Sequence, residues 1–549
     1  MSARASVETV YDLLRLPEEE IRRRFRVLKA RLPYLYKTVL PYRHAPRTVI
    51  VVPSLTLDQE VLSKIRGIHF YEERMLYHLM LLQLPRTQVI YVTSQAIHPT
   101  IVDYFLGLLP GVPISHARER LTLIYCHDAS ARSLTEKILS RPRLIQRIRE
   151  AIRYPEAAYL EVFNSTPHER RLAVALDVPL YACDPDLIHL GNKSWNRKIF
   201  QKAGVPYPDG FEDLRDEQDI VQAIADLKRR HPDLRRVVVK LNEGFSGEGN
   251  AIFDFRNMPE EVGNLETWIR RELPKRLRFE DPVESYERFM RKFEEMQGIV
   301  EIFIEGEGKR SPSVQGIIDP LGQGTIVSTH EQILGGPTKQ IYLGAMFPAY
   351  KDYRLQLHEL GRRVGWILSR EGAIGRFAVD FIAVPGKDGQ WKLYALEINL
   401  RKGGTTHPYA TLRYLTGGEY RLEDGLYYTG TGQPRYYYAT DNLYSADYIG
   451  MTPEDLMDLS LCEGLHFDAA TQEGIVFHLI GALSEYGKLG AVCIGASRER
   501  AEQFYKRALQ ALARASQGRT KCDAQPRTPE ERGAPTHFRP WWTKDRPLV

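Results

Sequence analysis

The stretch RVVVKLNEGFSGEGNAIFDF, Arg236–Phe255, decides the fold. A run of β-branched residues ends at Lys240, a short loop with three glycines follows, and an apolar pattern resumes at Ala251. A P-loop and a dinucleotide-binding turn both place a helix after their glycines, whereas this stretch returns to a strand. The order predicts a mobile hairpin whose backbone N–H groups close over a polyphosphate beside Lys240. Taken alone, it fits an ordinary glycine-rich turn equally well.

Bulk composition describes a globular protein of two to four domains, with 549 residues, 43% hydrophobic and 26% charged. The formal net charge is +5, but the segment from Ser516 onward has seven Lys/Arg against four Asp/Glu and so holds three of those charges. The rest of the chain is close to neutral for its size. The net charge therefore does not argue for a nucleic-acid partner, and we expect none.

The start of the chain, MSARASVETVYDLL, lacks the apolar core of a signal peptide, and no run approaches the ~20 apolar residues of a spanning helix. We expect a cytoplasmic protein without a membrane partner. The five cysteines have no metal-ligand spacing. The sequence leaves the oligomeric state open.

Changes in pattern along the chain predict five segments. Residues 1–46 form a helical segment, and residues 47–190 alternate strand and helix four times, which indicates a parallel α/β domain. Residues 191–425 contain the glycine hairpin, a long charged helical region at 259–296 and several antiparallel strands, an α+β pattern. Residues 426–515 have a helical and mixed pattern. We expect this segment to extend the core rather than to pack over the active-site cleft. Residues 516–549 have a disordered composition.

Two strands near residue 400 carry the strongest chemical signal. Asp380 lies in the apolar run GRFAVDFIAV, and Glu397 and Asn399 lie two apart in KLYALEINL, so both point to one face of their strand. A carboxylate in such an environment costs several kcal/mol unless a cation or hydrogen bonds compensate. Any one of these residues fits a buried ion pair. Together the three predict a Mg²⁺ site.

Two arginines accompany these acids. Arg401 follows Asn399 by two positions and shares its face, where a guanidinium can hold a transferring phosphoryl group or the carboxylate that receives it. Arg376 precedes Asp380 by four positions and points to the same side. It is a second candidate for that role or a plain partner for the acids.

These motifs resemble the ATP-grasp superfamily of carboxylate–amine ligases and, within it, the pheganomycin-type peptide ligases. The resemblance spans about Arg47 to Ala515. It implies a pre-ATP-grasp parallel α/β domain, an ATP-grasp α+β domain and a small mixed C-terminal domain. For the nucleotide, it implies two bracketing lysines, a phosphate-covering loop, a hinge whose backbone reads adenine and an acid for the ribose. The matching positions are Lys193 and Lys240; Gly244, Ser246, Gly247 and Gly249; Glu301, Ile302, Phe303 and Ile304; and either Glu305 or Glu307.

The same resemblance assigns Asp380, Glu397 and Asn399 to one or two Mg²⁺ ions, with Mn²⁺ as a substitute, and Arg401 to the arginine that follows the metal triad. It implies an enzyme that activates a small-molecule or peptide carboxylate with ATP, through an acyl phosphate, and joins it to an amine. Two alternatives keep the nucleotide site: a sensor or scaffold that binds ATP without turnover, and a kinase that phosphorylates a hydroxyl group.

Overall fold

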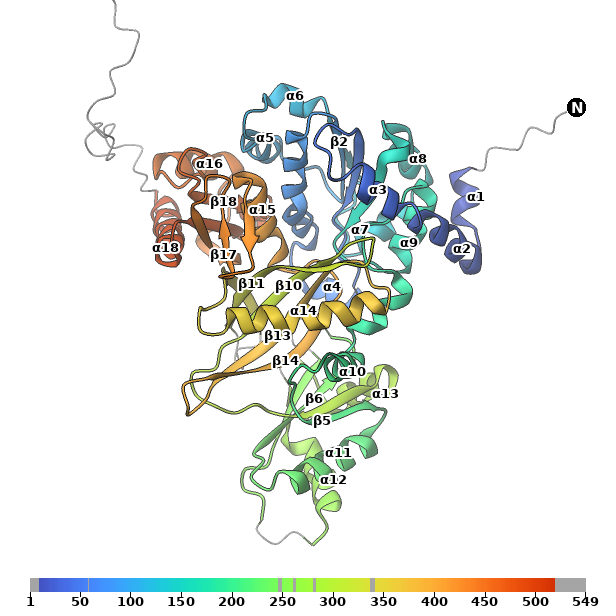
Figure 1. Ribbon diagram of the computed structural model, residues 1–549, viewed down its shortest axis with the longest axis vertical. Helices are drawn as coiled ribbons and strands as arrows, with labels where there is room; N and C mark the ends of the chain where they lie inside the picture. Colours follow the sequence, from blue (N-terminus) through green and yellow to red (C-terminus); the bar gives the residue numbers. More distant parts are fainter. Residues whose placement is uncertain are drawn as a thin grey trace, which may run out of the picture.

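Three β-sheets organise the protein, and Figure 1 shows them as three levels along the long axis. The computed structural model describes residues 9–57, 59–244, 249–259, 263–279, 283–335 and 341–518. A parallel four-stranded sheet lies at the top, and a five-stranded antiparallel sheet forms the lower end. A ten-stranded antiparallel sheet crosses the middle and extends through β17 and β18 upward beside the N-terminal unit. The mixed α/β class predicted from the sequence is confirmed.

The upper sheet has the order β3-β2-β1-β4, and all its neighbouring strands are parallel. Strands β1 and β2 are the two central strands of this sheet. Every residue of both is buried, as expected for a parallel sheet with helices on both faces. The strands are β1 Arg47–Val52, β2 Thr87–Thr93, β3 Leu121–Tyr125 and β4 Ala158–Val162. The helices are α1 Val10–Leu14, α2 Glu18–Lys29, α3 Leu32–Thr38, α4 Gln59–Lys64, η1 Ile68–Gln83, α5 Pro99–Gly107, α6 Ile114–Arg118, α7 Leu134–Leu139, α8 Pro142–Ala151, η2 Pro155–Ala157 and α9 Pro167–Leu176.

The lower sheet contains the glycine hairpin and has the order β5-β9-β6-β7-β8. Strands β6 and β7 pair antiparallel from Arg236↔Asp254 to Lys240↔Asn250, which confirms the predicted strand, loop, strand order. The charged region predicted to be helical is interrupted by β8. The elements are η3 Pro185–Gly191, α10 Lys193–Ala203, β5 Gly210–Leu214, α11 Glu217–Arg230, β6 Arg236–Leu241, β7 Asn250–Asp254, α12 Leu265–Arg276, β8 Leu277–Phe279, α13 Tyr286–Met296 and β9 Gly298–Ile302.

The middle sheet runs β14-β13-β10-β11-β12-β17-β16-β15, with β19 joined to β17 and β18 joined to β19. Helix α14 crosses it in Figure 1. The elements are β10 Pro312–Ile318, β11 Gly324–Gly335, β12 Ile341–Phe347, α14 Arg354–Arg370, β13 Gly375–Pro385, β14 Trp391–Asn399, α15 Thr406–Thr416, β15 Glu419–Arg421, β16 Leu426–Tyr428, β17 Pro434–Tyr444, η4 Ala446–Tyr448, α16 Pro453–Cys462, β18 Gly474–His478, α17 Ala482–Tyr486, β19 Lys488–Gly495 and α18 Arg498–Ala515.

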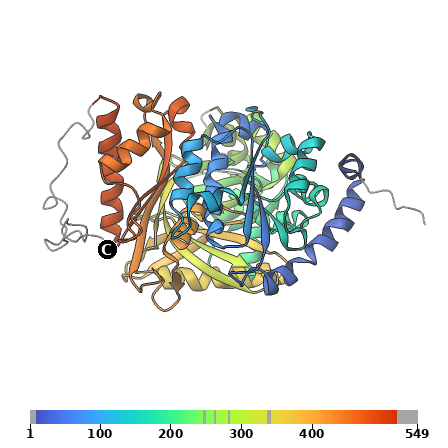
Figure 2. The same cartoon turned by 90° about the horizontal axis from the view of Figure 1, so that it is seen from above.

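The C-terminal segment extends this middle sheet, since β17 pairs with both β12 and β19. The helical character expected for the segment holds only in part, because three of its longer elements are strands. Figure 2 shows the segment packed beside the N-terminal unit, with α1 and α2 at the far side of the molecule. The tail expected to be disordered lies, from residue 519 onward, outside the described residues. No helix in the described part of the chain is long and apolar enough to cross a membrane.

Glu73 of η1 joins the N-terminal unit to the C-terminal segment. Its buried carboxyl accepts a hydrogen bond from the Gly481 N–H, with oxygen distances of 3.2 and 3.1 Å. Burial raises the pKa of Glu73 to about 8, from an ordinary value of 4.5. A carboxyl whose pKa is raised by folding stabilises the fold fully below the unfolded-state pKa, and this contribution is lost as the pH rises toward the folded-state pKa.

We therefore expect Glu73→Gln to flatten the pH dependence of stability. Glutamine keeps the shape of the side chain and cannot ionise, so the variant should lose less stability than wild type between about pH 5 and pH 8, by at most about 1.4 kcal/mol per pH unit. Thermal unfolding of both proteins across this range measures the difference. Parallel curves for the two proteins would contradict the assignment.

Candidate active site

The beginning of α10 lies where the lower and middle sheets meet. Asn192 caps the helix by accepting from the Trp195 N–H. The Lys193 N–H donates to the Asn242 carbonyl at 3.2 Å, and the Ser194 N–H donates to the Asn242 side-chain oxygen at 3.0 Å. Because Asn242 directly follows β6, these bonds fix the first residue of α10 beside the glycine loop.

Lys193 connects the glycine loop to the acidic strands. Its side chain is buried, and Nζ lies 3.5 Å from Oε1 of Glu397 on β14. A Cβ built on Gly244, at the start of the loop, would lie 3.7 Å from the same Nζ. One ammonium group therefore contacts the acidic strands and approaches the glycine loop.

Lys240, the second predicted nucleotide lysine, is also buried. Its Nζ lies 2.5 Å from Oε1 of Glu301 on the neighbouring strand β9. Arg197, one turn after Lys193 on α10, lies 3.5 Å from the other oxygen of Glu301. The carboxylate of Glu301 thus holds two cations in place. Glu301 also pairs with Gly210 and Val238 within the sheet.

The two ends of the glycine loop approach each other through their backbones. A Cβ on Gly244 would lie 3.3 Å from the Gly249 Cα, and the Leu241 N–H donates to the Gly249 carbonyl at 2.9 Å. A side chain at Gly244 would press against this closure, which explains glycine there. Ser246 and Gly247, also predicted for the loop, lie outside the described residues.

The predicted hinge follows β9. The N–H groups of Ile302 and Phe303 already donate to the carbonyls of Asp209 and Arg236, at 2.9 and 3.1 Å. The Ile304 carbonyl accepts from Lys309 Nζ at 2.9 Å. Two hinge N–H groups are therefore already hydrogen-bonded within the protein. Adenine would have to bind the remaining backbone groups of the hinge.

The two acids predicted as alternatives for the ribose differ in their surroundings. Glu305 forms an ion pair with Arg236, with a 2.9 Å bond from Nε to Oε1. Glu307 is exposed and makes no ion pair with another described residue. These surroundings favour Glu307 over Glu305 as the carboxylate available to a ribose.

The predicted metal ligands lie together on β13 and β14. Asp380 and Glu397 are directly opposite in the strand pairing, and Asn399 donates to Asp380 Oδ2 at 3.1 Å. Gln332 of β11 donates to the other oxygen of Asp380 at 2.7 Å. Burial, together with the Glu397 carboxylate, raises the pKa of Asp380 to about 7.

This set of donors fits Mg²⁺. Two carboxylates facing each other in a partly buried site repel, and a divalent cation between oxygen ligands removes that repulsion. The amide of Asn399 supplies a further oxygen of the kind that Mg²⁺ accepts. The residues present therefore match the predicted cation, and Lys193 lies on the side where the phosphates of a nucleotide would be.

The structure separates the two predicted arginines. The charges of Glu397 and Asp380 act on Arg401, although burial is the larger influence and lowers the pKa of its guanidinium. Arg376 shares the face of Asp380, and its charge acts on His78 of η1. Burial lowers the pKa of His78 to about 4, and the Arg376 charge acts in the same direction. One Nη of Arg376 is buried and has no hydrogen-bond partner within the part of the chain that the structure describes.

Three residues of the site did not emerge from the sequence: Arg197, Gln332 and Arg74. Arg197 could have been found from the sequence, because it lies four positions after Lys193 on one helix face. Nothing in the sequence points to Gln332, since a glutamine in an alternating strand is ordinary. Arg74 comes from η1, and both it and Arg401 lie over the ring of Phe163, at 5.0 and 6.0 Å from its centre.

Known structures share this arrangement of sheets. The biotin carboxylase of Campylobacter jejuni, solved as a β,γ-ATP complex, gives a TM-score of 0.51 at 13% identity, covering 85% of this chain and 91% of that one. The biotin carboxylase domain of Hydrogenobacter thermophilus 2-oxoglutarate carboxylase, solved with MgADP and bicarbonate, gives 0.50 at 13% identity, with 84% and 89% covered. At this identity the likeness shows the fold.

Sequence relatives show the family. Residues 185–276 and 275–423 match the family model described as IQCH-like, ATP-grasp, and residues 456–508 match the PGM1 C-terminal domain. The chain belongs to the ATP-grasp carboxylate–amine ligases. It is 31% identical over 476 residues to the L-propargylglycine–L-glutamate ligase of Streptantibioticus cattleyicolor, covering 85% of this chain and 94% of that protein. It is also 24% identical over 402 residues to IQ motif-containing protein H of Danio rerio, covering 65% of this chain and 38% of that protein.

Proposed function

We propose that this ligase joins the carboxylate of one amino acid or short peptide to the amine of another, and converts ATP to ADP and phosphate. The observation that carries the proposal is the Lys193 side chain, which touches Glu397 and approaches the glycine loop at Gly244. A phosphate held by the loop would therefore lie beside the acids. The Streptantibioticus relative, a ligase named for two amino acids, supports the substrate class.

The reaction has two steps. A carboxylate oxygen of the first substrate attacks the γ-phosphorus of ATP, the bond to the β,γ-bridging oxygen breaks, and ADP leaves. The amine of the second substrate then attacks the acyl carbon and loses a proton, and phosphate leaves with the oxygen that came from the carboxylate. Phosphoryl transfer depends mainly on positioning and charge neutralisation.

The residues of this chain supply both. Lys240, held by Glu301, and Lys193, held by Glu397, place two ammonium groups at fixed positions for the phosphates. Asp380, Glu397 and Asn399 would hold one or two Mg²⁺ ions, for which Mn²⁺ can substitute, and the cation would neutralise phosphate charge.

The two arginines are assigned to the substrate carboxylate and the transferring phosphoryl group. Arg401, beside the acids, is assigned to the charge that develops on the transferring group. Arg376, with one buried and unbonded Nη, is a second site for a substrate carboxylate or phosphate. Because water would hydrolyse the acyl phosphate, we expect the glycine loop to close before transfer.

Two other functions use the same nucleotide site. A kinase would transfer the phosphoryl group to a hydroxyl and release no free phosphate, and a sensor would bind ATP without consuming it. The facing acids with their lysine favour turnover over binding alone, and membership of a ligase family favours amide formation over hydroxyl phosphorylation.

Product analysis distinguishes the three functions. We expect ADP, phosphate and a condensed product in equal amounts when ATP and Mg²⁺ are supplied with a panel of amino acids and dipeptides, glutamate among them. Phosphate release and mass spectrometry of the same mixtures provide the measurement. A phosphorylated substrate without free phosphate would replace the ligase by a kinase, and ATP binding without product under all conditions would replace it by a sensor.

A further inference from the structure

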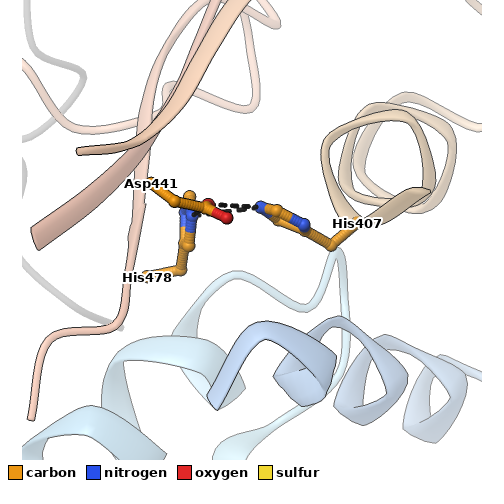
Figure 3. A group of neighbouring side chains, drawn as sticks. All are labelled: His407, Asp441 and His478. Carbon is orange, nitrogen blue, oxygen red and sulfur yellow. Dashed lines mark hydrogen bonds and ion pairs between the residues drawn. The ribbon is translucent and has the colours of Figure 1, made fainter. Parts of the chain in front are cut away.

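A second cluster of ionisable side chains lies outside the carboxylate site, where the N-terminal unit, α15 and the C-terminal strands meet. His407 is on α15, Asp441 on β17 and His478 on β18, and all three are buried. Figure 3 shows the two imidazole rings and the carboxylate converging from these three elements. Nothing in the ligase reaction proposed above uses them.

The three inner atoms are close enough to share one ion. Nε2 of His478 lies 2.7 Å from Oδ1 of Asp441 and 3.0 Å from Nε2 of His407, and the remaining side of the triangle is 3.4 Å. A circle through points with these separations has a radius of about 1.8 Å, so one position lies ~2.0–2.1 Å from all three atoms. Those are the distances at which Zn²⁺ binds imidazole nitrogen and carboxylate oxygen.

Hydrogen bonding alone accounts poorly for this arrangement. An N–H on His478 Nε2 donates well along one direction, and its short contact with Asp441 takes that direction. Nε2 of His407 then meets the same N–H from the side. The other ring nitrogen of His478, Nδ1, is buried and has no hydrogen-bond partner among the described residues. A cation that accepts a lone pair from each of the three inner atoms satisfies all of them at once.

A neighbouring cation orients one of the three proposed ligands. Nη1 of Arg74 donates to Oδ2 of Asp441 at 3.1 Å, which orients the carboxylate and leaves Oδ1 facing the histidines.

We propose that His407, Asp441 and His478 bind one divalent transition-metal ion of the zinc class, separately from the Mg²⁺ site. Two histidines and one carboxylate select such ions over Mg²⁺, which prefers oxygen ligands. The ion ties α15 to β17 and β18. Through Asp441 it also fixes Arg74, whose charge acts on Arg401 in the ligase site. Three protein ligands leave a position open for water or a substrate group.

Metal titration of the full chain tests the proposal without any measurement of activity. The protein is stripped with a chelator, dialysed, and titrated with Zn²⁺ for elemental analysis and with Co²⁺ for visible ligand-field absorption. We expect one equivalent of either ion, a Co²⁺ spectrum of low coordination number that Mg²⁺ does not displace, and a higher thermal unfolding temperature with Zn²⁺. No stoichiometric binding in the wild type would overturn the proposal, and it would identify the cluster as a hydrogen-bonded junction only.

Two variants locate the ion. Asp441→Asn keeps the size of the side chain but removes the charge of a proposed ligand. Loss of a residue that only hydrogen-bonds to a ligand lowers metal affinity roughly 10- to 100-fold, and we expect Asp441→Asn to weaken Co²⁺ binding by more than this. His330→Gln is the matched control, because His330 is a buried histidine of the same sheet that donates to or accepts from Tyr437 and lies outside the cluster. Asp380→Asn checks the carboxylate site. Unchanged Co²⁺ affinity in Asp441→Asn, or loss of the spectrum in Asp380→Asn with Asp441→Asn unaffected, would place the ion elsewhere and overturn the assignment.

Discussion

Glu397→Gln is expected to lower ADP formation by more than about 1,000-fold while the fold stays intact. Glutamine keeps an oxygen for Lys193 but loses the charge that faces Asp380 across the strand pairing. Because the Glu397 carboxylate helps to raise the pKa of Asp380, its removal also relieves repulsion within the folded protein. The measurement is ADP release under saturating ATP and Mg²⁺, with circular dichroism and thermal unfolding to verify the fold.

The matched control for this prediction is Glu359→Gln. Glu359 lies on helix α14, which packs against the same sheet, and it pairs with Arg362 and Arg363. The same chemical change is therefore made outside the site. This variant should turn over ATP like the wild type. Near wild-type ADP release from a folded Glu397→Gln protein would remove the metal assignment.

Lys240→Met is expected to lower kcat/KM for ATP by on the order of 100-fold, equivalent to ~3 kcal/mol of transition-state stabilisation. The substitution removes an ammonium group fixed 2.5 Å from Glu301. Glu301 keeps Arg197 as a partner at 3.5 Å, so the buried carboxylate is not left without a cation. Steady-state kinetics with varied ATP provide the measurement.

Lys202→Met serves as the control for Lys240→Met. Lys202 lies near the end of α10 and forms an exposed ion pair with Glu371, a contact of small energetic value. Its kcat/KM should match the wild type. If the two variants behaved alike, Lys240 would have no part in nucleotide binding or transfer.

The elements that could be predicted from the sequence are those whose signal is local. The glycine hairpin and the strands carrying Asp380 and Glu397 each combine a β pattern with a turn, and the structure confirms both hairpins. The course of the C-terminal segment could not be predicted. Its strand β17 is defined by pairing with β12 and β19, and no local pattern specifies which distant strands will be neighbours.

Local contrast in the sequence also determines which site residues could be predicted. Carboxylates in otherwise apolar strands contradict the local pattern, so Asp380 and Glu397 were detectable before the fold was known. The partners that hold them, such as Gln332, have no such contrast. The cluster of His407, Asp441 and His478 shows the limit most clearly. Its members come from one helix and two strands, and only the packing of α15 against the C-terminal strands brings their atoms within 3.4 Å.

Carboxylate activation by phosphorylation moves an oxygen atom from the substrate to phosphate. An accepted amino acid carrying ¹⁸O in its carboxylate is incubated with ATP, Mg²⁺ and the amine substrate, and the phosphate released is analysed by mass spectrometry. We predict one ¹⁸O atom in that phosphate for each amide bond formed. Unlabelled phosphate, or label recovered in AMP, would rule out the acyl phosphate.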